Sequence, residues 1–114
     1  MRNAIQEKSF SFAVRIVKLC NYLKKEKHET VLSRQLLRAG TSIGANVAES
    51  KHAQSRADFC SKLNIALKEA AETDYWLRLL HSNDYLNDTA FLSIYGDCQE
   101  LERMLAAIVK TVKA

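Results

Sequence analysis

The chain has 114 residues, a length that suits a single domain with its own hydrophobic core. It contains no proline and three glycines, so it lacks the turn residues of most β proteins, and its composition favours long helices. The formal net charge of +4, with a pI near 9.1, permits contact with nucleic-acid phosphates without requiring it.

The N-terminal residues and the cysteines bear on the compartment. Residues 1–6 are a short polar stretch, so no signal or transit segment is predicted. The three cysteines are widely spaced and form no C-x-x-C pair. That pattern is typical of small buried hydrophobic residues in a reducing compartment. Together the two observations predict a cytoplasmic protein.

The first predicted helix, residues 9–25, is apolar on two sides. Positions three and four apart share a helix face, and an ordinary surface helix carries one apolar stripe. The second stripe is therefore the first sign of self-association. The inward stripe is Phe12, Ile16, Leu19 and Leu23, and the second, on nearly the opposite side, is Phe10, Val14 and Val17.

A basic wedge lies between these stripes. A tyrosine among basic residues suits single-stranded RNA or DNA, because bases stack on aromatic rings and cations meet phosphates. The alternative is an ordinary solvated face, although an oligomer would repeat the wedge and add avidity. The wedge consists of Lys8, Arg15, Lys18, Tyr22 and Lys25.

A charged connector, residues 24–30, leads to the second predicted helix, residues 31–52, with Thr30 or Ser33 as its N-cap. Gly40 and Gly44 lie inside this helix, where each glycine costs about 1 kcal/mol relative to alanine. We expect close approach of another helix to offset that cost. A kink, or a ligand approaching the backbone, is the alternative.

A membrane span is not predicted for this helix. The Gly-x-x-x-Gly spacing is known best from membrane helices. However, Arg38, Asn46 and Glu49 interrupt any run of about 20 apolar residues. Asn46 and Ser42, at the edge of the apolar face, are expected to hydrogen-bond a neighbouring helix.

The third predicted helix, residues 56–81, begins after Ser55, which forms a capping box with Asp58. Its outer stripe mixes apolar residues with two carboxylates, for which Arg34 or Arg38 of the second helix are the expected cross-helix partners. This stripe is the second candidate for an oligomer interface, beside that of the first helix. It consists of Ile65, Glu69, Glu72, Trp76 and Leu79.

The fourth predicted helix covers residues 88–112, with Asn87 or Asp88 as its cap. Its apolar seam has a spacing close to a heptad. Four helices with short connections predict an all-α, antiparallel up-down-up-down four-helix bundle, with residues 1–114 as one domain. The seam is Phe91, Ile94, Tyr95, Cys98, Leu101, Leu105, Ile108 and Val112.

Catalytic and metal chemistry find little support. A di-iron bundle needs Glu-x-x-His on two helices, and only Glu49 with His52 has this spacing. Glu69 and Glu72 would act as an acid/base pair only with a raised pKa, and no nucleophile accompanies them. No metal, cofactor or enzymatic activity is predicted.

Three segments resemble a known family. They are the run QLLRAGTSIGANVAE at residues 35–49, the pattern Ser55-x-x-Asp58-Phe59, and residues 63–77. They are similar to the four-helix-bundle proteins encoded in intervening sequences of bacterial 23S rRNA genes, a family that includes accessory variability proteins of diversity-generating retroelements. Many members have glycine where this chain has Ser50. The most specific positions are Ser42, Ile43, Asn46 and Glu49.

The resemblance implies a homopentamer without known enzymatic activity. It also implies that relatives bind nucleic acid and a reverse transcriptase through a basic surface. We therefore expect a homo-oligomeric bundle that binds nucleic acid, first of all RNA, or a ribonucleoprotein partner. The alternative is a protein-interaction scaffold without nucleic-acid binding.

Overall fold

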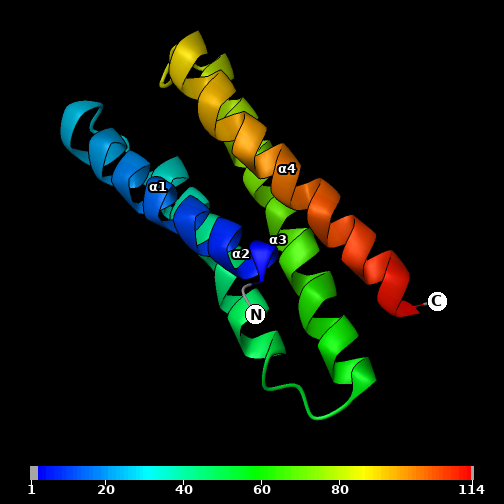
Figure 1. Cartoon of the computed structure of the whole chain (residues 1–114). Helices are drawn as coiled ribbons and strands as arrows, with labels where there is room; N and C mark the ends of the chain where they lie inside the picture. The colour runs from blue at the N-terminus through cyan, green and yellow to red at the C-terminus, as the bar shows by residue number, and fades with distance from the viewer. Residues whose placement is uncertain (1–2, 114) are drawn as a thin grey trace.

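The computed structural model describes residues 3–113, which fold into four helices joined by short connections (Figure 1). Successive helices run antiparallel, so the all-α four-helix bundle is confirmed. Residues 1, 2 and 114 of the predicted domain lie outside the described residues. The helices are α1 (Ala4–Glu26), α2 (Val31–Ser50), α3 (Arg56–Ser82) and α4 (Asp88–Lys113).

Helix α1 begins at Ala4, so the expected start near Ser9 is wrong. Asn3 is the N-cap, and its side chain accepts a hydrogen bond from the Ile5 amide at 3.1 Å. Ile5 and Ser9 are both buried. The helix therefore contributes an additional inward-facing turn to the core.

Helix α2 is capped by Glu29 rather than by Thr30 or Ser33. The Glu29 carboxylate accepts hydrogen bonds from the amides of Val31, Leu32 and Ser33, with the Leu32 amide at 2.6 Å. Thr30 occupies the cap position but makes no capping bond with its side chain. The orphan amides of the first turn are satisfied by a longer side chain that reaches forward from the preceding residue.

The remaining helix ends agree more closely with prediction. Ser55 caps α3 by accepting from the Asp58 amide at 3.0 Å, and Asn87 caps α4 by accepting from the Ala90 amide at 2.8 Å. Helix α2 ends at Ser50, two residues earlier than predicted. The Ser50 hydroxyl donates to the Val47 carbonyl at 2.6 Å, so the serine closes the last turn.

Helices α1 and α2 approach closely at the two glycines. A Cβ atom on Gly40 would lie 2.8 Å from Cγ1 of Ile16, and one on Gly44 would lie 3.2 Å from the Ser9 carbonyl oxygen. Both neighbours are fully buried residues of α1. The prediction that these glycines allow tight helix packing is confirmed.

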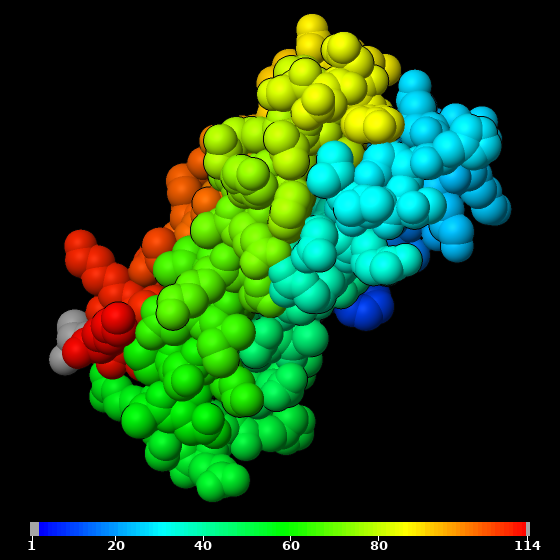
Figure 2. All heavy atoms as spheres, turned by 180° about the vertical axis from the view of Figure 1, so that it is seen from behind, coloured from blue at the N-terminus to red at the C-terminus, as the bar shows by residue number. Residues whose placement is uncertain are grey.

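The bundle is held together unevenly. Helix α2 packs extensively on α3, α1 on α2, and α3 on α4, whereas α1 and α4 contact each other sparsely. Figure 2 shows α2 and α3 side by side from behind, and Figure 1 shows α1 and α4 diverging toward the upper end. The side of the bundle between α1 and α4 is therefore its most open side.

From Phe91 to Leu105 the α4 seam is buried as predicted, except for the partly buried Tyr95; near its end Val109 is buried and Ile108 and Val112 are only partly buried. A straight α-helix drifts by about 20° per heptad. The inward position therefore moves by one residue over the length of α4.

Candidate nucleic-acid and assembly surfaces

The structure divides the basic wedge of α1 into a paired half and a free half. Lys8 Nζ lies 2.8 Å from Glu100 Oε1, and Arg15 Nη1 lies 2.6 Å from Asp97 Oδ2. The hydrogen bond to Glu100, followed by the charge of Glu100, raises the pKa of the Lys8 amine. These contacts bridge α1 and α4 across the open side, so two of the wedge cations are neutralised by carboxylates of the same chain.

The second half of the wedge is free. Lys18, Tyr22 and Lys25 are exposed, and no described side chain forms an ion pair or hydrogen bond with them. Their spacing of four and three residues places them on one face of α1. We define these three residues as the basic face.

The apolar stripe of α1 points away from the core. Phe10 is 71% exposed, and Val14 and Val17 are also exposed, whereas Phe12 and Ile16 of the inward stripe are buried. The two-sided character predicted for this helix is confirmed. Its role in oligomer formation stays a prediction.

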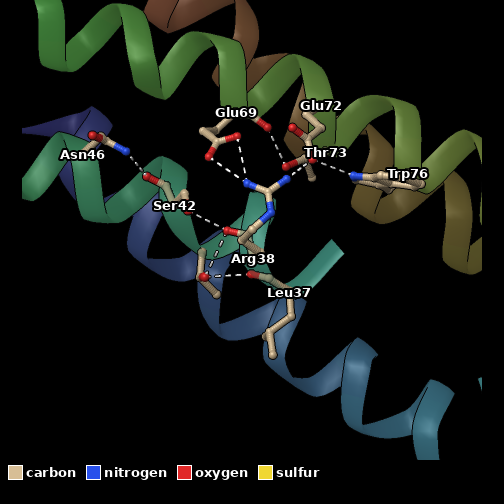
Figure 3. A network of polar contacts seen from close by, with 9 residues as sticks. Leu37, Arg38, Ser42, Asn46, Glu69, Glu72, Thr73 and Trp76 are labelled. Atoms are coloured by element: carbon tan, nitrogen blue, oxygen red, sulfur yellow. Dashed lines mark hydrogen bonds and ion pairs between the residues drawn. The ribbon is translucent and has the colours of Figure 1, made fainter. Parts of the chain in front are cut away.

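A polar network ties α2 to the outer stripe of α3 (Figure 3). Arg38 Nη1 lies 3.2 Å from Glu69 Oε2, and its Nη2 donates to the Glu72 carboxylate. Glu72 also accepts a hydrogen bond from Trp76 Nε1 at 2.9 Å. Arg38, and not Arg34, is therefore the cross-helix partner of both carboxylates, and the network positions the Trp76 ring.

Asn46 and Ser42 do not bond to a neighbouring helix as expected. Asn46 Nδ2 donates to the Ser42 carbonyl at 2.8 Å, and Ser42 Oγ donates to the Arg38 carbonyl at 2.6 Å. Both bonds stay within α2 (Figure 3). A short polar side chain inside a helix can satisfy its donors on the carbonyl four residues earlier.

Sequence reasoning missed an acidic pair between α3 and α4. The Asp74 carboxylate accepts hydrogen bonds from Arg78 Nε at 2.8 Å and from the Tyr95 hydroxyl at 3.0 Å, and it also hydrogen-bonds Glu102. Tyr95, Cys98 and Glu102 share one face of α4 by their spacing. The spacing could have been read from the sequence, because Glu102 follows Tyr95 and Cys98 on the face of α4 that carries the apolar seam.

The pKa values of Asp74 and Glu102 are shifted in opposite directions. Burial, followed by the hydrogen bond and charge of Asp74, raises the pKa of Glu102 to about 7. Burial also raises the pKa of Asp74, but the bonds from Glu102, Arg78 and Tyr95 together outweigh it and lower that pKa. The shared proton therefore lies on the Glu102 side of the pair.

Residues 3–113 contain two buried cysteines and no arrangement typical of a metal site or a membrane span. Cys20 and Cys98 are buried thiols, and burial raises the pKa of Cys20 to about 11 and raises that of Cys98 as well. Within the described range no group of three or more His, Cys, Asp or Glu residues is arranged to hold a metal ion. None of the described helices is long and apolar enough to cross a membrane.

Comparison with known proteins identifies the family of this bundle. The family profile described as 23S rRNA-intervening sequence protein matches residues 1–107. The chain belongs to this family. No curated protein matches it.

A solved structure has the same fold and supports the assignment to the 23S rRNA-intervening sequence family. It is a protein of unknown function from the S23 ribosomal protein family of Bacteroides thetaiotaomicron VPI-5482. The two chains are 52% identical, with a TM-score of 0.93, over 94% of this chain and 99% of the other. The family resemblance seen in residues 35–77 is thus confirmed.

Proposed function

We propose that this 23S rRNA-intervening sequence protein is a non-enzymatic, homo-oligomeric bundle. It binds nucleic acid, with RNA as the preferred ligand, through the basic face of α1. The observation that carries the proposal is the contrast along α1. Lys8 and Arg15 are neutralised by α4, whereas Lys18, Tyr22 and Lys25 are exposed and unpaired among the described residues. Two cations flanking an aromatic ring match the requirements of a single strand.

Self-association is the second part of the proposal. Phe10 and its neighbours Val14 and Val17 expose apolar surface on the side of α1 opposite the core. Removing such surface from water stabilises an interface by about 25 cal/mol per Å². A ring of copies would then repeat the basic face and add avidity for one nucleic-acid chain. The family name refers to an intervening sequence of 23S rRNA, so this RNA is the first ligand to test.

The test is a charge reversal in the basic face. We expect the Lys18→Glu/Lys25→Glu double variant to bind single-stranded RNA more weakly, because two phosphate contacts are lost. The slope of log K against log salt should fall by about one to two. The measurement is fluorescence anisotropy of a labelled oligonucleotide over a salt series.

The matched control reverses two exposed cations elsewhere on the chain. Arg103 and Lys110 of α4 are exposed and have the same spacing of seven residues. The Arg103→Glu/Lys110→Glu variant has the same net charge as the α1 variant and should keep the wild-type affinity. Equal losses in both variants would indicate binding to net charge alone and would refute the basic face.

A second candidate function rests on the exposure of Phe10. An exposed apolar helix face also suits docking of a partner protein, for which a reverse transcriptase is one expectation from the family resemblance. This scaffold function predicts salt-insensitive binding to a protein and no binding to RNA.

A further inference from the structure

The upper end of the bundle contains a cavity that the basic face borders. It has a volume of about 380 Å³ and lies between the C-terminal end of α1 and the turn that joins α3 to α4. Figure 2 shows both segments beside each other at that end of the molecule. This volume is at the small end of the range for small-molecule pockets, about 300–1,000 Å³. The lining includes Tyr22, Lys27, His81, Asp84, Tyr85 and Asp88.

The His81 ring lines one wall of the cavity and is held in place by its neighbours. The His81 ring stacks on Phe91, with centroids 4.0 Å apart and planes 5° apart. Its Nε2 lies 2.8 Å from Asp88 Oδ1. Phe91 in turn stacks on Tyr95, with centroids 4.7 Å apart. A ligand entering here would meet an ordered wall, so binding would cost little side-chain entropy.

The opposite side offers an unoccupied aromatic ring. Tyr22 is 45% exposed, and within residues 3–113 its hydroxyl makes no hydrogen bond. Tyr22 belongs both to the lining and to the basic face, where Lys18 and Lys25 lie four residues before it and three after it. A strand whose phosphates meet these lysines would therefore bring its bases to the mouth of the cavity.

The charges in the cavity select the part of a nucleotide that fits. Lys27 is the cation of the lining, and Asp84 and Asp88 are carboxylates. Two carboxylates repel a phosphate, but they accept hydrogen bonds from amino groups. The cavity suits a base, with the phosphates held outside it.

We infer that this cavity receives one unstacked base of a bound single strand, stacked on Tyr22, and favours bases that carry an exocyclic amino group. The inference rests on the proposed function, because it presupposes that the basic face binds nucleic acid. It adds to that function a base-binding site and a preference for cytosine, adenine or guanine over uracil.

The test compares labelled oligomers of cytidine and of uridine on the full-length protein. We expect Tyr22→Leu to weaken binding of the cytidine oligomer roughly tenfold, the size of one base stacked on an aromatic ring. Tyr22→Phe should stay within about twofold of wild type, because the ring is kept. The matched control is Tyr75→Leu, since Tyr75 on α3 is 48% exposed and lies outside the cavity lining. It should bind as wild type does.

The base preference has its own variant. Asp84 has a positive φ of 65°, which asparagine tolerates, so Asp84→Asn keeps the turn. It replaces a pure acceptor with an amide that also donates. The preference for cytidine over uridine should therefore fall severalfold.

The possible results distinguish failure of the base site from failure of the basic face. If Tyr22→Leu binds the cytidine oligomer as wild type does while Lys18→Glu/Lys25→Glu loses binding, the base site is refuted and the basic face stands. Equal wild-type affinity for cytidine and uridine would refute the base preference. If wild-type protein binds neither oligomer, both the proposed function and the base site are overturned.

Discussion

Two mid-helix glycines stand in opposite surroundings. A Cβ on Gly40 would collide with Cγ1 and Cγ2 of Ile16, at 2.8 and 2.9 Å, whereas a Cβ on Gly96 would meet nothing within 4 Å. Ile16 is completely buried, so any shift of its side chain would disturb the close packing around it. The same substitution should therefore have opposite effects at the two sites.

We expect Gly40→Ala to lower the free energy of unfolding by about 1–3 kcal/mol through overpacking. Gly96→Ala should raise it by about 1 kcal/mol, because alanine is the better helix former. Urea denaturation of both variants measures the difference. Stabilisation by Gly40→Ala would show that α1 does not pack as closely on α2 as described.

At the same scale, helix caps show what a sequence reveals. Ser55 and Asn87 were predicted because serine and asparagine are common N-caps whose side chains act locally. Glu29 was missed because glutamate is not a usual cap. It acts here only because the turn before α2, with His28 at a φ of 54°, brings its carboxylate onto three amides.

At the scale of paired elements, the contact between α3 and α4 should depend on pH. The pKa of Glu102 is raised from its ordinary value of 4.5 to about 7, so folding takes up a proton between these values. The stabilising contribution of this group is complete below pH 4.5 and is lost as the pH rises through 7. The lowered pKa of Asp74 acts oppositely, and its contribution is lost only in acid.

Glu102→Gln keeps a hydrogen-bond donor toward Asp74 without a titrating proton. We expect it to be more stable than wild type at pH 8 and close to wild type at pH 5, as measured by urea denaturation at both values. Glu100→Gln, on the same helix but paired with Lys8, is the control and should show no gain at pH 8. A pH-independent difference for Glu102→Gln would contradict the shared proton.

Contacts between α1 and α4 were the part of the structure that the sequence could not predict. The spacing in α1 correctly predicted an inward stripe and an outward stripe. It did not predict that Lys8 and Arg15 would be paired, because their partners Glu100 and Asp97 are on α4, at the other end of the chain. Such partners depend on how the two helices are rotated in the bundle, and spacing within one helix does not contain that information.

At the scale of the whole molecule, assembly is the main prediction. We expect light scattering to give a mass of several chains, near five, at both low and high salt, because apolar contacts are insensitive to salt. Phe10→Glu/Val17→Glu should reduce the mass to that of one chain. Leu92→Glu changes another apolar side chain, 67% exposed on α4, and should leave the mass unchanged.

A fluorescence reading accompanies the mass. Trp76 is the chain's single tryptophan and is partly buried beside the Arg38 network. If the outer stripe of α3 joins the interface, dissociation of the oligomer should shift its emission to longer wavelength. A wild-type protein of one-chain mass would refute the assembly proposal.

The fold was more accessible to prediction than the function, and residues 35–49 show why. This segment carries the clearest family resemblance, yet in the structure Gly40 and Ile43 are buried and Gly44 lies against α1. Of the residues that carry the resemblance, Gly40, Ile43 and Gly44 are thus packing residues of α2. They specify how helices meet, and the exposed residues that would choose a ligand lie elsewhere.

The contact pattern has a consequence for synthesis of the chain. The extensive contacts join helices that are neighbours in sequence, and the sparse one joins the first helix to the last. The hairpin of α1 and α2 can therefore form on the ribosome before α4 has been translated. During that interval Lys8 and Arg15 lack the carboxylates that later neutralise them. The nascent chain presents all four cations of the wedge, and completing translation halves that charge.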